Sequence, residues 1–403
     1  MYAQRAGLER TVRHLAALER PSASPGERQA AEWIAGALRE LGLEAAVEEE
    51  RAHGTYWWPL GLLSAAGVAA GALALRGRRT TAALVGAAAA AGIADDCSAG
   101  PHVFRRVLPH RTTWNVVADA GDVAAAETLV IVSHHDAAHT GMVFDQRPVE
   151  LLARLAPERF EKADRWPELF RAIAGAPALV AVGALAGRRR AVKAGMALGA
   201  LSTAGFAQIG ASPVVPGAND NLTAVATILG LAERLRDDPV QGLRVILAST
   251  GAEESFMEGM RGFLRRHAAR LSPPRTRFLA IDTVGSSAKL DAAESEGMIV
   301  QTSYDAPLKD EISAAAADAG VRLRRGLELS FATDALPAMR AGYRAALLAS
   351  VNEFKLPGNY HKPTDTADNV DYERVEEAVR VSDALVRRLA REAAGQPNRV
   401  LAG

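Results

Sequence analysis

The most informative part of the chain is the stretch Thr128-Leu-Val-Ile-Val-Ser-His134-His135-Asp136. Its run of apolar, mostly β-branched residues predicts a strand that is buried on both faces of a sheet. In an extended chain His134 and Asp136 face the same side, so one can bind a metal ion while the other fixes a ring nitrogen. Taken alone, these residues fit an ordinary polar strand end equally well.

Similar apolar runs predict further strands at 114–118, 243–249, 277–282, 298–302 and 345–349, with a polar edge strand at 44–51. Apolar residues at helical spacing predict two helices within 7–42 and others at 221–236, 257–270, 306–319 and 371–393. Strands that alternate with helices are typical of an α/β protein in which helices cover both faces of a sheet. The fold class predicted from this pattern is a three-layer αβα sandwich.

Composition excludes several classes of protein. The 403 residues are 49% hydrophobic and 23% charged, which suits a packed core. The formal net charge is zero, so nothing indicates a nucleic-acid partner. Cys97 is the only cysteine, so any metal ion must be bound by His, Asp and Glu. The first 20 residues carry charges throughout, and we expect no cleaved signal peptide there.

Four more segments place carboxylates or an imidazole at or just after predicted strand ends, where open α/β sheets form their sites. They supply Asp220 after a glycine turn, the adjacent pair Glu253 and Glu254, Asp282, and His361. Each segment alone has a simpler explanation as a helix cap or a solvated loop. Adjacent carboxylates point apart, so one of the pair suits a metal ion and the other suits a general base.

Taken in order, these segments resemble the M28 family of zinc aminopeptidases. The shared pattern is His-x-Asp, Gly-Ala-x-Asp, Glu-Glu, a strand-end Asp and Tyr-His-x-x-x-Asp-Thr. The resemblance covers roughly residues 5–54 and 113–395, apart from one insertion. It implies a zinc-exopeptidase fold, in which the central sheet of the sandwich is mixed.

The resemblance also implies a ligand set for two Zn²⁺ ions, although other divalent transition metals suit the same atoms. His134, Asp220 and Asp282 would bind one ion. Glu254, His361 and the same Asp220 would bind the other, so that Asp220 bridges the two. Nitrogen and oxygen ligands with an open position are typical of catalytic zinc.

Two further roles follow from the resemblance. Glu253 would be the general base and acid, and Asp136 would orient His134. The implied reaction is release of N-terminal amino acids from peptide substrates. His135 and His139 are additional histidines near the first ligand, and we expect neither to bind metal. Asp365 or Asp368, which follow His361, could cap the last helix.

The chain departs from the family pattern at two positions near the expected substrate. Met260 stands where a serine is usual, and Ala335 follows Thr333-Asp334 where Ser-Asp-His is common. These differences bear on substrate specificity more than on metal binding.

Two long apolar stretches with basic turns interrupt the α/β pattern. They predict a domain division in which residues 1–54, 112–136 and 213–403 form the catalytic domain. Residues 55–111 form one apolar helical hairpin insertion, and residues 137–212 form a second. The uncharged runs within them are 56–75, 80–94, 172–187 and 194–212.

These hairpins have two interpretations. A membrane span needs about 20 apolar residues, which 56–75 and 194–212 approach, and aromatic residues at 56–58 suit a membrane interface. This predicts a membrane-associated protein whose hairpins contact lipid. Basic turns in the cytoplasm would place the catalytic domain outside, whereas the lack of a signal peptide places it inside, so the orientation stays open. The alternative is a soluble, alanine-rich lid over the active site of a cytoplasmic protein. Nothing in the sequence indicates an oligomeric state.

Three other functions remain compatible with the sequence. A carboxypeptidase or dipeptidase of the same fold would need a cation for the substrate carboxylate, for which Arg324, Arg325 or Arg340 is available. A glutaminyl-cyclase-like acyltransferase has a similar fold. A non-catalytic binding relative would have lost ligands, whereas all five ligands and Glu253 are present here.

Overall fold

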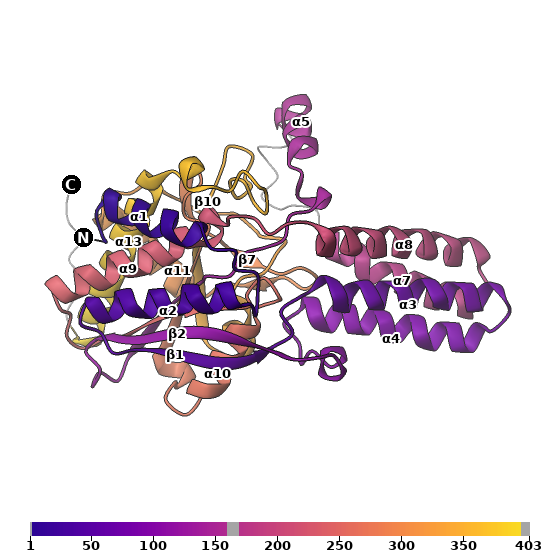
Figure 1. Cartoon of the computed structure of the whole chain (residues 1–403), viewed down its shortest axis with the longest axis horizontal. Coiled ribbons are helices and arrows are strands. Elements are labelled where there is room, and N and C mark those ends of the chain that lie inside the picture. The colour runs from indigo at the N-terminus through magenta and orange to yellow at the C-terminus, as the bar shows by residue number, and fades with distance from the viewer. Residues whose placement is uncertain (1, 159–168, 396–403) are drawn as a thin grey trace.

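The computed structural model describes residues 2–158 and 169–395. The centre of the molecule is a mixed sheet with helices around it (Figure 1). The sheet has eight strands in the order β1-β2-β4-β3-β5-β10-β6-β9. The strands are β1 (Ala45–Ala52), β2 (Arg111–Gly121), β3 (Thr128–His134), β4 (Arg244–Thr250), β5 (Thr276–Asp282), β6 (Lys289–Ala292), β9 (Leu323–Arg324) and β10 (Arg344–Val351). β3, β4, β5 and β10 are mutually parallel, whereas β1 pairs with β2, β2 with β4 and β6 with β10 in antiparallel fashion.

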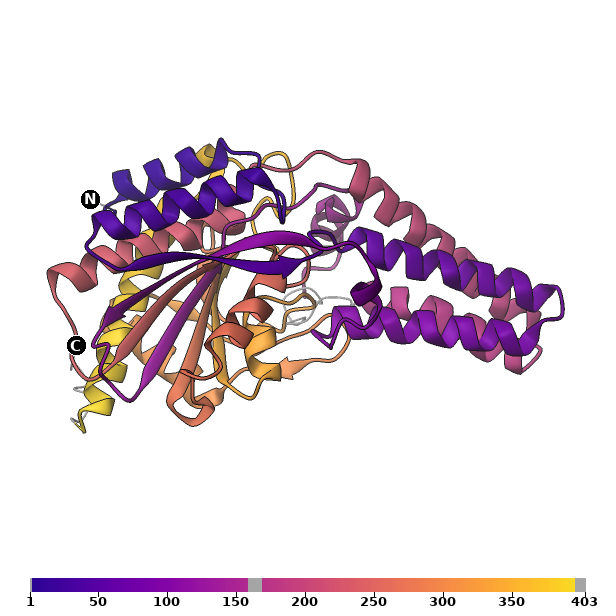
Figure 2. The same ribbon diagram turned by 60° about the horizontal axis from the view of Figure 1, so that its bottom comes forward.

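Helices cover both faces of the sheet, which confirms the predicted α/β sandwich (Figure 2). Side chains of β3 alternate between two cores, because Leu129 and Ile131 lie in one cluster while Val130 and Val132 lie in the other. The first core is covered by α1 (Arg5–Ala16), α2 (Pro25–Glu40), α9 (Thr223–Asp237), α11 (Ala306–Asp318) and α13 (Tyr372–Ala393). The second is covered by α10 (Glu258–His267) and α12 (Ala335–Arg340).

The strand predicted at 298–302 is wrong. The chain there bends after Gly297, whose φ of 146° lies outside the usual range for other residues, and it forms only a short two-stranded ribbon of β7 (Ser295–Glu296) and β8 (Thr302–Ser303). Met298 is buried because it packs into the second core rather than into a sheet. The sheet instead uses β6, which has only four residues and carries a lysine and an aspartate, so its apolar signal is weak.

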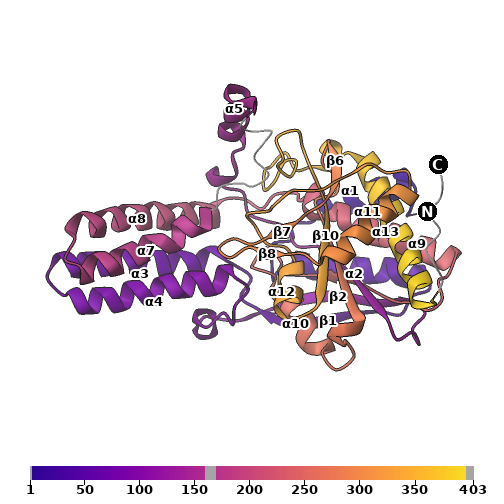
Figure 3. The same ribbon diagram turned by 180° about the vertical axis from the view of Figure 1, so that it is seen from behind.

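Four helices form a bundle that projects from one end of the sandwich (Figure 1). They are α3 (Trp57–Leu75), α4 (Arg79–Cys97), α7 (Leu169–Leu185) and α8 (Arg189–Ala211), and the short α5 (Arg147–Leu155) lies apart from them. α3 packs against α4 and α8, and α7 packs against α4 and α8. The two hairpins predicted separately therefore form one unit, which Figure 3 shows from behind.

Small residues bring the bundle helices close together. A Cβ atom added to Gly67 would lie 2.8 Å from the Cβ of Pro177, and one added to Gly195 would lie 2.6 Å from the backbone oxygen of Ala176. The turns of both hairpins meet at the far end, where Gly187 lies beside the guanidinium of Arg79. Of the described helices, Trp57–Leu75 alone has the length and the apolar composition to cross a membrane, and Leu169–Leu185 is apolar but shorter.

Arg20, just after α1, ties the N-terminal helices to two loops at the end of the sheet. Its buried guanidinium donates hydrogen bonds to the backbone oxygens of His135 at 2.8 Å, Pro216 at 2.6 Å and Gly217 at 2.6 Å. These three acceptors belong to segments that flank two of the predicted metal ligands.

Arg20→Leu is therefore expected to destabilise the protein by at least about 3 kcal/mol, because each buried carbonyl left without its donor costs about 1–3 kcal/mol. Denaturant unfolding measures the difference. Arg13→Leu is the matched control, since Arg13 lies on α1 and, among the described residues, its ion pairs are exposed ones with Glu9 and Asp368. Equal losses in the two variants would contradict this role for Arg20.

Candidate metal centre

The five predicted ligands meet at one edge of the sheet. β3, β4 and β5 are parallel neighbours, so their carboxyl ends lie together. His134 ends β3, Glu254 follows β4 and Asp282 ends β5. Asp220 reaches the same edge from the loop before α9, and His361 reaches it from the loop before α13.

Asp220 lies between the two imidazoles. Its Oδ1 is 3.2 Å from Nε2 of His134, and its Oδ2 is 3.3 Å from Nε2 of His361. Glu254 Oε2 lies 3.2 Å from the same nitrogen of His361, and Asp282 Oδ2 lies 3.8 Å from Nε2 of His134. One ligand atom each of His134, Asp220 and Glu254 fall within 4.8 Å of one another. The arrangement has two halves that share Asp220.

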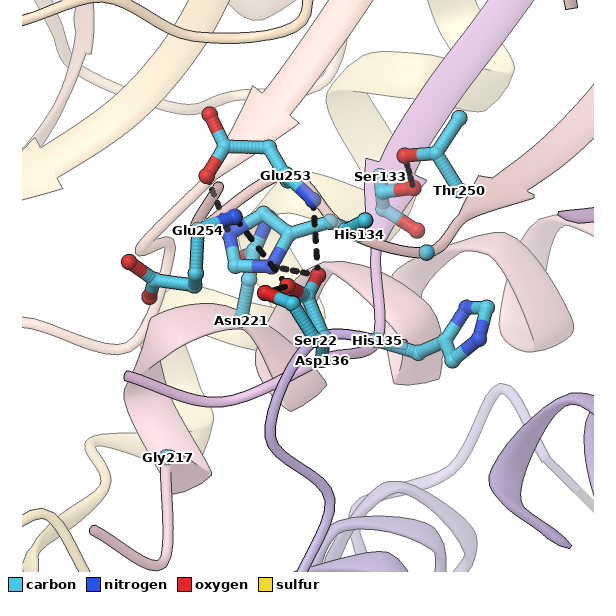
Figure 4. Close-up of polar contacts among 12 residues, drawn as sticks. Ser22, Ser133, His134, His135, Asp136, Gly217, Asn221, Thr250, Glu253 and Glu254 are labelled. Atoms are coloured by element: carbon cyan, nitrogen blue, oxygen red, sulfur yellow. Dashed lines mark hydrogen bonds and ion pairs between the residues drawn. The ribbon is translucent and has the colours of Figure 1, made fainter. Parts of the chain in front are cut away.

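Asp136 supports this cluster from behind (Figure 4). Its Oδ1 lies 3.4 Å from Nδ1 of His134 and accepts the amide hydrogen of Glu253 at 3.1 Å. Its Oδ2 accepts hydrogen bonds from Ser22 at 2.6 Å and from the amide of Glu254 at 3.1 Å. Burial alone would raise the pKa of Asp136, but the donors of His134 and Ser22 lower it below its ordinary value. Asp136 therefore stays ionised while it positions one histidine and both glutamates.

Glu253 lies beside the cluster rather than between its imidazoles. Its Oε2 is 3.8 Å from Nε2 of His134 (Figure 4). Burial, together with the carboxylates of Asp334, Glu254 and Asp282, raises the pKa of Glu253 well above its ordinary value. A carboxyl group with a raised pKa can both take up and return a proton near neutral pH.

The cluster has the donor set that a divalent cation needs. Among the residues described, Asp220 Oδ2, Glu254 Oε1 and His361 Nε2 are buried and have no hydrogen-bond partner. Buried polar atoms without partners are costly, and a cation would satisfy them. Imidazole nitrogens and carboxylate oxygens suit zinc. These residues therefore fit a metal ion.

Metal binding at pH 7 is expected to release protons. Burial alone would lower the pKa of His361, but Glu254 and Asp220 raise it to about 10. Burial and Asp220 raise the pKa of Asp282 well above its ordinary value. His361 then holds a proton at pH 7 in the metal-free protein and must lose it to bind metal, so affinity increases with pH. The raised pKa of Asp282 acts in the same direction.

Calorimetric titration of Zn²⁺ in buffers of different ionisation enthalpy measures this release. We expect a total release of at least about one proton, the one that His361 holds in the metal-free protein. A release near zero would contradict the description of the metal-free cluster.

Two carboxylates that were not predicted to belong to the metal site also lie there. Asp365 accepts hydrogen bonds from the amides of Asn219 at 2.7 Å and Asp220 at 3.1 Å, so it shapes the loop that carries Asp220. Its expected role as a helix cap is wrong, because the cap of α13 is Asp371. The motif that contains His361 also contains Asp365, but the contact between Asp365 and the loop of Asp220 appears only in the folded structure.

Asp334, at the start of α12, is the second such carboxylate. It is buried and accepts a hydrogen bond from Thr250 at the end of β4. Burial raises the pKa of Asp334 to about 6. Its segment was placed near the substrate, but no role was assigned to Asp334 because the residue that follows it, Ala335, departs from the family pattern.

The additional histidines lie away from the cluster. His135 points to the other side of the chain, where its Nδ1 is 2.9 Å from Ser249 Oγ (Figure 4). The ring of His139 packs against Trp57 at an interplanar angle of 58°, with ring centres 4.5 Å apart, and its Nδ1 lies 2.7 Å from the backbone oxygen of Ser212.

The chain is thus an αβα sandwich with a buried His, Asp and Glu cluster at the carboxyl edge of its sheet. Residues 202–386 match the model of peptidase family M28. This match confirms the resemblance to M28 peptidases that was drawn from the sequence. The matched region contains Asp220, Glu253, Glu254, Asp282 and His361, whereas His134 and Asp136 precede it.

Solved structures with the same fold include aminopeptidases and a cyclase. An aminopeptidase from Aneurinibacillus sp. strain AM-1 is 14% identical, with 96% of this chain and 94% of that one covered at a TM-score of 0.55. A zinc aminopeptidase from Bacillus subtilis is 14% identical, with 95% and 94% covered at 0.53. A glutaminyl cyclase from Fimbriiglobus ruber is 13% identical, with 95% of both chains covered at 0.54.

At these identities the similarity concerns the fold. No curated protein sequence matches the chain. The family match and the cluster together support a peptidase with a metal site.

Proposed function

We propose that the protein is an aminopeptidase that removes N-terminal amino acids from peptides with two Zn²⁺ ions. The observation that carries this proposal is the position of Asp220, which presents one carboxylate oxygen to His134 and the other to His361. Asp282 would complete the first ligand set, and Glu254 would complete the second. Each set then combines nitrogen and oxygen donors, as catalytic zinc sites do.

When bound, the ions would acidify a water molecule and polarise the scissile carbonyl group. Glu253 would accept a proton from that water as its oxygen forms a bond to the carbonyl carbon. Glu253 would then donate the proton to the departing amine nitrogen as the carbon–nitrogen bond breaks. Asp136, through its bonds to the amides of Glu253 and Glu254, would hold both side chains in position.

The charges around the site favour an aminopeptidase over a carboxypeptidase. None of the described residues lining the cavity at the cluster is Lys or Arg, so a substrate carboxylate would find no cation there. Arg324 is paired with Asp291, and Arg325 is paired with Glu294 and Asp310. The surplus of carboxylates suits a protonated amine instead.

Hydrolysis of matched peptides tests the proposal. The panel contains free and N-acetylated alanyl peptides, each with a free or an amidated carboxyl end. We expect cleavage wherever the amino group is free, whichever form the carboxyl end takes. Cleavage that requires a free carboxyl end would overturn the aminopeptidase in favour of a carboxypeptidase.

A glutaminyl cyclase is the second candidate because a cyclase shares the fold. It would attack the γ-carboxamide of an N-terminal glutamine with the peptide's own amine and release ammonia. Mass spectrometry of a glutaminyl peptide separates the two reactions. Loss of ammonia without cleavage would favour the cyclase, whereas release of free glutamine would favour the peptidase.

We also propose that the four-helix bundle lies in a membrane. Trp57–Leu75 is long and apolar enough to span one. Apolar side chains on the outside of the bundle, such as Leu84, Val182, Leu185 and Leu201, are between 65% and 72% exposed. Carbonate washing of membranes from expressing cells tests this proposal. We expect the full-length protein to stay in the pellet, and its release into the supernatant would contradict it.

A further inference from the structure

An apolar cavity of about 740 Å³ lies between the metal cluster and the base of the bundle. Glu253, Glu254 and His361 line its inner end, so whatever occupies it lies next to the reacting groups. A cavity of about 150 Å³ holds one benzene ring, so this space is several times larger than an aromatic side chain requires. It is too large for one ordinary amino-acid side chain.

The shape of the cavity follows helix α8. Residues from Leu198 to Ile209 line it, a distance of about 16 Å at 1.5 Å per residue. Ile173 and Phe170 of α7 face it from the neighbouring helix. An occupant would therefore be elongated and would extend from the cluster toward the bundle.

The wall of the cavity that α7 and α8 supply offers little to the backbone of a peptide. Ser202 Oγ donates a hydrogen bond to the backbone oxygen of Leu198 in its own helix. The side chain of Gln208 accepts from the amide of Met142 and donates to Ser212. Peptide groups placed in this space would lose their bonds to water at a cost of about 1–3 kcal/mol each. An alkyl chain has no such groups and gains about 0.8 kcal/mol for each buried CH₂.

We infer that this cavity binds a linear alkyl chain, so that the substrate of the proposed aminopeptidase is an amide with a free amine and a long alkyl group. This inference rests on the proposed function for the reaction, but the alkyl site itself does not. The exposed positions of Leu198 and Leu201 leave the outer end of the cavity open beside the apolar surface of the bundle.

Binding of n-alkylamines with four, eight and twelve carbons to the full-length, zinc-loaded protein tests the site. Calorimetry should show affinity at least about tenfold higher for twelve carbons than for four, since each buried CH₂ is favourable. Equal affinity along the series would overturn the inference.

Two glycine variants separate the cavity from unspecific binding to the bundle or to lipid. A Cβ atom at Gly205 or at Gly175 would have no neighbour within 4 Å, so either helix should accept a phenylalanine. Gly205 of α8 lines the cavity, whereas Gly175 of α7 does not. Gly205→Phe is expected to abolish the dependence on chain length, and Gly175→Phe is expected to preserve it. The same dependence in both variants would overturn the inference in favour of partition into lipid or a surface.

Hydrolysis of alanyl p-nitroanilide by the wild-type protein is measured alongside. Chain-length-dependent binding without this hydrolysis would refute the proposed aminopeptidase and leave the alkyl site standing. Hydrolysis without chain-length-dependent binding would refute the alkyl site and leave the proposed aminopeptidase standing.

Discussion

Glu253→Gln is expected to lower kcat by at least about a hundredfold, because general acid–base groups contribute typically 10²–10⁴ in rate. The amide has the shape of the carboxyl group but cannot accept the proton of water. Glu253 lies 3.8 Å from His134 and outside the two imidazole–carboxylate sets, so the variant should keep its zinc. Loss of turnover without loss of metal separates a proton-transfer role from a ligand role.

Turnover of an alanyl p-nitroanilide and the zinc content of the same sample provide the two readouts. Glu32→Gln is the control, because Glu32 is an exposed residue of α2 that pairs only with Arg28 among the described ion pairs. Wild-type turnover in Glu253→Gln would remove Glu253 from the mechanism. Loss of zinc together with activity would make it a ligand instead.

Asp220→Asn is expected to weaken zinc binding at both sites by more than about a hundredfold, the upper range for residues that only support a ligand. Both imidazoles lie beside the carboxylate of Asp220, so neutralising it affects both halves of the cluster. Activity should fall with the metal. Competition against a chelator of known affinity measures the loss.

Asp365→Asn is the matched control for this variant. Asp365 accepts hydrogen bonds from the backbone of the Asp220 loop and presents no atom to the imidazoles in the described contacts. Its loss should weaken zinc binding by about 10–100-fold, as supporting residues do. A larger effect for Asp365→Asn than for Asp220→Asn would contradict the bridging position of Asp220.

The parts of the fold that the sequence predicts are those with strong local patterns. The run at 128–133 forms β3, and the helical spacing at 372–393 forms α13. The strand predicted at 298–302 is wrong because an apolar run can also be buried outside a sheet. β6 was not predicted because it is short and partly charged. Local sequence does not record which surface an apolar residue will meet.

The candidate site depends on topology in the same way. His134 and His361 are far apart in the chain. His134 ends β3 and His361 lies in the loop after β10, and the parallel order of β3, β5 and β10 brings these two ends to the same edge of the sheet. The order of motifs predicted this meeting through a resemblance rather than through any local signal. Asp334 and Asp365 also lie in segments of this pattern, but their contacts with Thr250 and with the loop of Asp220 emerge only with the tertiary structure.

The apolar cavity is the part of the site that the sequence predicts least. Its walls come from α7, α8, the segment after β4 and the loop before α13. The sequence predicts two apolar hairpins, but their pairing into one bundle follows from contacts between α3 and α8 and between α4 and α7. The domain division and the membrane association of the hairpins stay predictions.

Anomalous diffraction at the zinc absorption edge tests whether Asp220 lies between two metal ions. We expect two peaks in crystals of the zinc-loaded protein, one on each side of the Asp220 carboxylate. One peak should be within bonding distance of His134 and Asp282, and the other within that of His361 and Glu254. Peaks elsewhere, or none beside Asp220, would refute a two-metal centre built on Asp220.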